Sequence, residues 1–152
     1  MKIRTAAPED IDSLVNFNQK MAQETEGKYL ENGVLRNGVS AVFQDENKGF
    51  YVVADDGGAI VGGLMVTFEW SDWRDKWFWW IQSVYIVPSE RGKRIYGDLY
   101  ASVKTKADER GNVCGFRLYV EKENLRAQRV YERVGMKRAD YLMYEEKIKP
   151  ES

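Results

Sequence analysis

Apolar residues recur along the chain with two periods, and each period predicts one kind of element. A period near 3.6 residues, in which apolar side chains share one face, is typical of amphipathic helices. This period occurs in residues 11–21, 32–44, 95–103 and 124–134. Alternation of apolar and polar residues, or a short continuous apolar run, is typical of strands. Such segments are residues 2–6, 49–54, 59–70, 77–87, 115–120 and 141–148.

Turn and capping residues separate these segments. Pro8 precedes the first helix, the sequence DDGG at 55–58 indicates a hairpin turn, and Pro88 ends a strand. Asn124 suits the N-cap of the last helix, and Gly135 suits its end. The predicted order is β-α-α-β-β-β-α-β-α-β. It indicates an α+β fold with a central mixed, mostly antiparallel, twisted sheet of about six to seven strands flanked by about four helices.

Length and composition predict a single folded domain over residues 1–152. A chain of 152 residues fits one hydrophobic core, and 43% hydrophobic with 31% charged residues is near the average of globular proteins. The net charge is −1 with acids and bases interspersed, so we expect no nucleic-acid partner. No apolar stretch approaches the roughly 20 residues of a membrane helix, so we expect no membrane association and a cytoplasmic location.

The chain has no histidine and one cysteine, Cys114. A disulfide within the chain is therefore excluded, and so are the Ser-His and Cys-His arrangements of nucleophilic catalysis. Without histidine we expect no metal site. Cys114 lies within an alternating apolar segment, where it reads as a small buried strand residue, although a lone reactive thiol is the alternative.

The segment SVYIVPSERGKRIYGDLY, residues 83–100, joins an apolar strand to a helix through a basic turn that contains glycine. The N-terminus of a helix presents unpaired backbone N–H groups and the positive end of the helix dipole. Arg91, Lys93 and Arg94 add positive charge at this point. The segment therefore predicts an anion site. A solvated basic turn that only starts a helix is the alternative.

Two motifs resemble those of the GNAT superfamily of acyl-CoA-dependent N-acyltransferases, and the resemblance extends over nearly the whole chain. The family's pyrophosphate loop has Arg or Gln, two residues, Gly, one residue, and then Gly or Ala. The sequence RGKRIY at 91–96 aligns with this loop, and Gly97 follows it. The second motif is a strand followed by Asn, Ala, Tyr and Gly at fixed spacings, and it appears as LYVEKENLRAQRVYERVGM at 118–136.

The resemblance implies that acetyl-CoA is the co-substrate and that no metal takes part. In relatives, two central strands diverge near a bulge, and the pantetheine arm of the cofactor lies between them. The implied cofactor-binding residues are Val84, Tyr85, Ile86, Arg91, Gly92, Lys93, Arg94, Ile95, Tyr96, Gly97 and Asn124. Arg94 replaces the usual glycine of the loop, and Tyr96 replaces glycine or alanine. The loop backbone can bind phosphates here if both side chains point away.

The resemblance also implies an acid and a base. A lysine-like amine has a pKa near 10.4, so its neutral, reactive form costs about 4.6 kcal/mol at pH 7. Many relatives place a glutamate on the strand before the loop, but residues 80–83 contain no acid, and Gln82 can only orient a water molecule. Other candidate bases are Glu24, Glu26 and Glu121. The family assigns protonation of the released thiolate to a tyrosine at the position of Tyr131, for which a core aromatic is the alternative.

All five tryptophans lie in WSDWRDKWFWW, residues 70–80. The resemblance implies that this segment adjoins the acceptor channel. Strand alternation puts Trp77 and Trp79 on one side and Trp80 on the other, so only part of the cluster can face the acceptor. We expect Trp80, Gln82 and Glu26 to bind the acceptor. The indole face of Trp80 would attract a cationic acceptor.

The sequence therefore predicts an N-acetyltransferase that transfers acetyl from acetyl-CoA to a primary amine by direct attack in a ternary complex. The acceptor is a small molecule or a peptide. The alternative is a non-catalytic module that binds CoA or a cation and uses the tryptophan-rich segment for ligands or proteins. A packed aromatic corner, or a homodimer patch at Trp70 and Trp73, also accounts for the cluster.

Overall fold

The computed structural model describes residues 1–149. Contacts divide the chain into two compact units, Met1–Leu118 and Tyr119–Ser152, and each unit has its own elements. The prediction of one domain over residues 1–152 stays a prediction. Within residues 1–149, no helix combines the length and the apolar character needed to cross a membrane.

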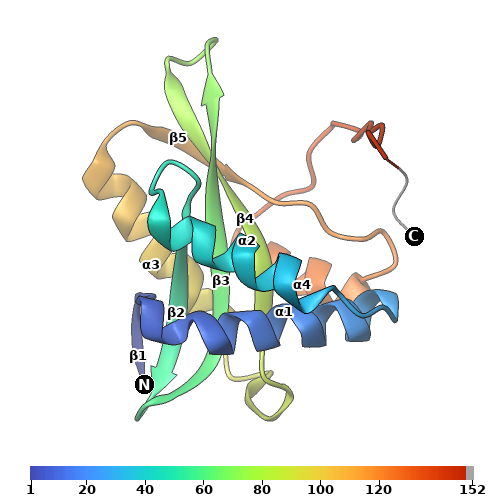
Figure 1. Cartoon of the computed structure of the whole chain (residues 1–152). Helices are drawn as coiled ribbons and strands as arrows, with labels where there is room; N and C mark the ends of the chain where they lie inside the picture. The colour runs from blue at the N-terminus through green and yellow to red at the C-terminus, as the bar shows by residue number, and fades with distance from the viewer. Residues whose placement is uncertain (150–152) are drawn as a thin grey trace. The chain divides into compact units, whose positions relative to one another are not determined.

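The first unit contains one open mixed sheet of five strands. The strands are β1 (Lys2–Thr5), β2 (Phe50–Asp56), β3 (Ala59–Ser71), β4 (Lys76–Ile86) and β5 (Val113–Arg117), and they follow this order across the sheet. The first four pair antiparallel: short turns join β2 to β3 and β3 to β4, and two helices join β1 to β2. A single helix joins β4 to β5, and these two strands are parallel. The sheet and its helices are drawn in Figure 1.

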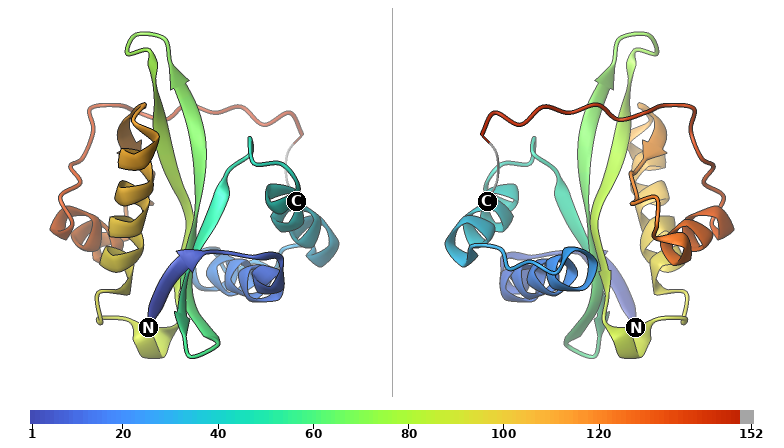
Figure 2. Two further views of the ribbon diagram at one scale, coloured as in Figure 1. Left: turned by 90° about the vertical axis from the view of Figure 1, so that its left-hand side faces the viewer. Right: turned by 90° about the vertical axis from the view of Figure 1, so that its right-hand side faces the viewer.

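Three helices cover the two faces of this sheet. The helices α1 (Ile11–Glu26) and α2 (Asn32–Gln44) lie on one face, and α3 (Ile95–Arg110) lies on the other (Figure 2). On the α1 face, Leu14 and Val39 of the helices pack with Val53 of β2. The neighbouring strand residue, Val52, is fully buried and points to the α3 face, as strand alternation requires. Two apolar layers therefore hold the sheet between helices.

An ion-pair cluster fixes the junction between β1 and α1. Arg4 donates two hydrogen bonds to the carboxylate of Asp10, at 2.8 and 3.1 Å, and a third to Asp55 at 3.1 Å. Asp10 also accepts a bond from the backbone N–H of Ala7 at 2.8 Å, and its side chain is only 6% exposed. These bonds, that of Arg4 first, hold the pKa of Asp10 below its usual value even though burial opposes ionisation.

The second unit contains the helix α4 (Leu125–Arg133). The side chain of Asn124 accepts a hydrogen bond from the backbone N–H of Ala127 at 3.1 Å, so the predicted N-cap is confirmed. The helix ends before Gly135, whose φ of 101° lies in the left-handed region.

Two strand predictions need correction. The predicted last strand, residues 141–148, is not a strand in the structure, so the described sheet has five strands and not the about six to seven expected. Alternation alone cannot supply the partner strand that a ladder requires, and the side chains of Tyr144 and Ile148 are exposed. The strand predicted over 115–120 occurs at Val113–Arg117, because its pairing with β4 sets its limits. The four helices are confirmed, and α2 has the predicted bounds.

Candidate functional site

The strands β4 and β5 pair along only part of their length. The pairs begin at Trp77 with Val113 and end at Trp80 with Arg117, whereas β4 continues to Ile86. Residues 81–86 of β4 therefore have no partner on β5, and within the five-stranded sheet of the first unit this edge of β4 is open. In Figure 1, β5 accompanies only the part of β4 nearest the β3–β4 hairpin. An open edge of this kind can pair with an extended ligand as an added strand would.

A bulge interrupts β4 beside this open edge. Gln82 pairs with Met65 and Tyr85 pairs with Gly63, so Ser83 and Val84 together oppose a single residue of β3. Ser83 has a φ of 52°, a left-handed conformation that is uncommon for a residue other than glycine. The bulge changes which residues face which helix. Gln82 lies opposite Met65 on the α1 face, and after the bulge the odd-numbered Tyr85 faces α1 as well, in ring contact with Phe17.

The backbone N–H and C=O of Ile86 point to the open edge of β4. The N–H of Val87 donates to the carbonyl of Val61 at 3.0 Å, and in the alternating pattern of an antiparallel pair this turns the peptide groups of Ile86 away from β3. The Ile86 carbonyl instead accepts a hydrogen bond from Nε of Arg91 at 2.9 Å. By the same alternation, the peptide groups of Tyr85 face β3, while its side chain takes part in the network described below.

The predicted phosphate loop connects this strand to α3. A short 3₁₀ turn at Pro88–Glu90 is followed by four residues without regular structure, and α3 begins at Ile95. Gly92 and Arg94 both have positive φ, at 83° and 65°. Arg94 thus adopts the conformation for which glycine is suited, at a cost of roughly 1–2 kcal/mol. Its side chain is exposed, and α3 has no side-chain cap at this end.

The side chain of Tyr96 points away from the loop. It is buried and stacks on Tyr100, with ring centroids 5.9 Å apart and an interplanar angle of 9°. Ile95 is buried as well. The side chain of Tyr96 therefore points away from the loop, as the sequence analysis required for phosphate binding. The exposed surface of the loop consists of backbone and the side chains of basic residues. Backbone N–H groups at a helix N-terminus are suited to phosphate oxygens.

A polar network joins the end of α1 to this region. The carboxylate of Glu24 accepts hydrogen bonds from the hydroxyl of Tyr85 at 2.6 Å and from Nη2 of Arg91 at 2.9 Å. The guanidinium of Arg91 also lies over the Tyr85 ring, 5.3 Å from its centroid. The hydrogen bond from Tyr85 is the largest cause that lowers the pKa of Glu24, and the bond from Arg91 is a smaller one. Desolvation, with a smaller effect of Glu24, raises the pKa of Tyr85 to about 12. A carboxylate with a lowered pKa is a weaker base, which disfavours Glu24 as the general base.

The tryptophan segment divides between the two faces, as alternation predicts. Trp77 and Trp79 contact the ring of Phe68, at centroid distances of 6.3 and 5.7 Å, and Trp79 is buried. Trp80 lies on the other face, where its Nε1–H donates to Glu69 at 2.7 Å. The remaining two, Trp70 and Trp73, are exposed near the tip of the β3–β4 hairpin. Most of the cluster is therefore core or hairpin, and Trp80 alone borders the open edge on the α1 face.

Glu69 connects several side chains beside Trp80. The same carboxylate oxygen accepts the bond from Trp80 and a bond from Nη1 of Arg117 at 3.0 Å, and the Arg117 guanidinium lies 3.6 Å from the Phe78 ring centroid. Gln82, the next residue on this face, donates to the hydroxyl of Thr67 at 2.6 Å. Sequence reasoning identified Trp80 and Gln82 but not Glu69, because its position depends on the β3–β4 register.

The predicted acid and the other candidate bases are spread over both units. Tyr131 lies on α4, and burial raises the pKa of its hydroxyl, which makes it a weaker acid than an exposed tyrosine. Glu26 is exposed at the end of α1, 3.7 Å from the ammonium of Lys28. Glu121 is exposed in the second unit. The strand, loop, Trp80, Gln82, Glu24 and Glu26 belong to the first unit, whereas Asn124, Tyr131 and Glu121 belong to the second.

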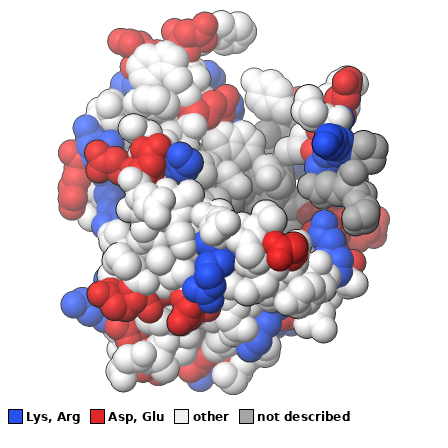
Figure 3. Space-filling view, in the orientation of Figure 1, with Lys and Arg blue, Asp and Glu red and all other residues white. Residues whose placement is uncertain are grey.

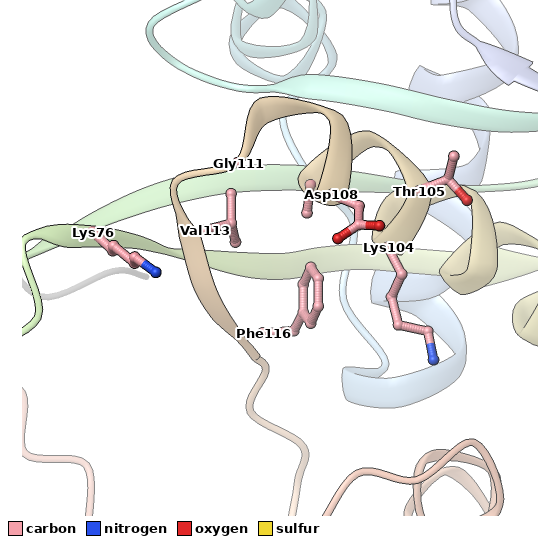
Figure 4. Close-up of a pocket in the computed structure, with 8 residues that line it drawn as sticks. Lys76, Lys104, Thr105, Asp108, Gly111, Val113 and Phe116 are labelled. Carbon is pink, nitrogen blue, oxygen red and sulfur yellow. The ribbon is translucent and has the colours of Figure 1, made fainter.

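A cavity of about 540 Å³ lies elsewhere in the first unit, at the C-terminal end of α3. Its lining residues are Lys76, Lys104, Thr105, Ala107, Asp108, Gly111, Val113 and Phe116. Figure 4 shows Lys104 and Asp108 projecting from α3 and the Phe116 ring on β5 between the two lysines. None of the predicted site residues lines it.

The half-buried Cys114 directs its sulfur at the Trp77 carbonyl, 3.4 Å away, which agrees with a structural role.

Surface charge and potential metal ligands add little to this site. Acidic and basic side chains are intermixed on the face of the molecule shown in Figure 3. Among the described residues, no group of three or more acidic or cysteine side chains is arranged to hold a metal ion.

The half-open β4–β5 pair, the bulge and the turn into α3 adjoin one another at one edge of the sheet. The model of the Acetyltransferase (GNAT) family matches residues 13–136, and the chain belongs to this family, which uses acetyl-CoA. Its similarity to the GNAT superfamily, predicted from the two motifs, is confirmed. No curated protein matches the chain significantly in sequence.

One solved structure supports the family, and two others share the fold. The chain is 44% identical to a possible acetyltransferase from Clostridium difficile 630, with 98% of each chain covered and a TM-score of 0.90. It shares its fold with a predicted acetyltransferase from Clostridium acetobutylicum solved with acetyl-CoA, at 20% identity, 95% coverage of both chains and a TM-score of 0.77. An aminoglycoside 6'-N-acetyltransferase from Acinetobacter haemolyticus has the same fold at 10% identity, with 99% of this chain and 100% of that chain covered and a TM-score of 0.80.

Proposed function

We propose that this protein transfers the acetyl group of acetyl-CoA to a primary amine by direct attack in a ternary complex. The observation that carries the proposal is the open edge of β4 over residues 81–86, which leads directly into the Arg91–Gly97 loop and the N-terminus of α3. An extended amide-containing chain can pair with the edge while its diphosphate reaches the loop. The described residues therefore fit the cofactor that the family uses.

Different parts of the site have different roles in binding. The carbonyl of Ile86 and the backbone around Val84 pair with the pantetheine arm, and the residues from Arg91 to Gly97 bind the pyrophosphate. Arg94 contributes a mobile charge in addition to backbone groups, because its side chain is exposed. Trp80 and Gln82 border the edge on the α1 face and contact the acceptor. Asn124, which caps α4, has a second role as a cofactor contact.

The chemistry requires two proton transfers. The neutral amine attacks the thioester carbonyl, a C–N bond forms, the C–S bond breaks, and the amine gives up a proton. A lysine-like amine is mostly protonated at pH 7, so the site must favour its neutral form by desolvation or by a base that acts through water. The departing thiolate takes a proton from the hydroxyl of Tyr131, a group that is protonated at neutral pH.

The first test measures the release of the CoA thiol from acetyl-CoA in the presence of a broad panel of primary amines. The protein has one thiol of its own, so it is used at catalytic concentration. Acceptor-dependent release identifies the activity and ranks the acceptors. Absence of release with every amine, at acetyl-CoA concentrations that saturate the protein, would refute the catalytic proposal.

The role of Tyr131 has its own test. Tyr131→Phe should lower kcat about 10²-fold while the KM for acetyl-CoA changes little, because it removes a proton donor and not a binding contact. The matched control is Tyr144→Phe, a tyrosine of the same unit that is 89% exposed. An unchanged kcat in Tyr131→Phe would remove its assigned role.

A non-catalytic module that binds CoA or a cation is the second candidate. The absence of an acid from residues 80–83 of β4 favours it, since many relatives carry a glutamate there. Binding measured by calorimetry, set beside the thiol-release assay, separates the two candidates. A module would bind a quaternary amine or CoA and release no thiol from acetyl-CoA. The cytoplasmic location, the homodimer and the absence of nucleic-acid and membrane partners stay predictions from the sequence.

A further inference from the structure

Arg91 is held in one orientation by groups from two other elements. Its Nε donates to the Ile86 carbonyl at the end of β4, and its Nη2 donates to Glu24 at the end of α1. The guanidinium lies over the ring of Tyr85, whose hydroxyl donates to the other oxygen of Glu24. The ring of Phe17 packs against Tyr85 at a centroid distance of 5.2 Å. The oxygens that accept from Arg91 and the Tyr85 ring beside its guanidinium are thus themselves held by other contacts.

This arrangement leaves much of the guanidinium available. An arginine side chain has five N–H donors, and the bonds to Ile86 and Glu24 use one donor each. Toward residues 1–149, three donors remain, on a side chain that is 32% exposed and that belongs to the first residue of the phosphate loop. The Ile86 carbonyl also retains an acceptor site, because a carbonyl oxygen has two lone pairs. Arg91 can therefore donate to a phosphate, and Ile86 can accept from a ligand amide, without breaking the network.

We propose that Glu24 is a positioning residue for cofactor binding: it holds Arg91 so that the remaining donors are aimed at the pyrophosphate. This inference rests on the proposed function and adds to it a residue that lies outside both family motifs. Its physical basis is preorganisation. A free arginine loses rotamer freedom when it binds a phosphate, whereas a side chain already fixed by Glu24 and Ile86 has lost that freedom on folding.

The negative charge of Glu24 has two opposite effects on this role. It partly neutralises the guanidinium, which lowers the attraction for a phosphate, but it also fixes the planar fork that makes bidentate contacts with phosphates. Glu24 is 40% exposed, so solvent weakens the effect of its charge. The proposal requires the orientation of Arg91 to have the larger effect on affinity.

The experiment measures the dissociation constant of CoA by calorimetry for the full chain and for variants of Glu24. Glu24→Leu should raise the constant about three- to tenfold, as expected for the loss of one preorganised side chain. Glu24→Gln keeps an oxygen that can accept from Arg91, so it should restore part of the affinity. The control is Asp12→Leu, which also removes an acid and one ion pair, with Arg36, from α1 and should bind CoA like the wild type.

Pantetheine, which lacks the pyrophosphate, separates positioning from a general structural effect. Its binding, measured by ligand-observed NMR because it is weak, should be the same for the wild type and Glu24→Leu. Unchanged CoA affinity in Glu24→Leu, or an equal loss for CoA and pantetheine, would overturn the positioning role and leave the proposed function standing. Failure of the wild-type protein to bind CoA would overturn both.

Discussion

The cluster around Asp10 allows a quantitative prediction about stability. Asp10→Asn keeps the size of the side chain but removes its charge and places an amide N–H₂ where a carboxylate oxygen accepted a hydrogen bond from Arg4. Loss of one partner from a buried pair costs about 3–5 kcal/mol. Arg4 is partly exposed and retains Asp55, so we expect about 2–4 kcal/mol here. For a chain of this length that corresponds to a decrease in Tm of roughly 5–15 °C.

Urea unfolding at pH 7 and at pH 3 measures this effect and its origin. Because the pKa of Asp10 is lowered in the folded protein, its stabilising effect is complete above the unfolded pKa near 3.9 and is lost as the pH falls through the folded pKa. The difference between wild type and Asp10→Asn should therefore shrink at pH 3. Asp12→Asn, on an exposed part of α1, should stay within about 0.5 kcal/mol of wild type. A difference for Asp10→Asn that is below that value at pH 7, or unaffected by pH, would contradict the reasoning.

Three further substitutions probe the site. Gly62→Ala would place a Cβ 2.7 Å from Cδ1 of Ile86 and 3.2 Å from the Tyr85 backbone carbonyl, so urea unfolding should show a loss of about 1–3 kcal/mol; wild-type stability would mean that the Ile86 side chain turns away and the β4 backbone yields easily. Arg94→Val should be about 1–2 kcal/mol less stable than Arg94→Gly, because β-branched residues avoid positive φ; equal stabilities would show that the loop relaxes. Asn124→Ala should lower the stability of α4 by about 0.5–2 kcal/mol in hydrogen exchange, whereas unchanged protection would deny the cap any importance.

Much of the first unit could be predicted from periodicity and turn residues. The bounds of α2 and the division of Trp77 and Trp80 between opposite faces follow from local patterns. The link between Glu24 and Arg91 could not be predicted, because it joins residues 67 positions apart and depends on how α1 crosses the sheet. Residues 141–148 show the opposite case, in which a strand-like pattern is present without a strand in the structure.

The loop shows how a local departure from a motif can be accommodated. The sequence identified Arg94 and Tyr96 as departures but could not tell where their side chains point. Tyr96 belongs to the first turn of α3, whose inward face is set by helical geometry, and it packs on Tyr100 four residues later. Arg94 accepts a backbone conformation suited to glycine and directs its side chain to solvent.

The bulge at Ser83 and Val84 also makes the middle of β4 tolerant of one change in length. Because these two residues together oppose a single residue of β3, loss of one of them would leave Tyr85 opposite Gly63 and on the face of Phe17 by ordinary strand alternation. The loss would instead change the path of the strand, because a bulge bends and twists the strand that carries it. A natural descendant of this protein that lacks one residue here should therefore have a straighter β4 with the contacts of Tyr85 retained.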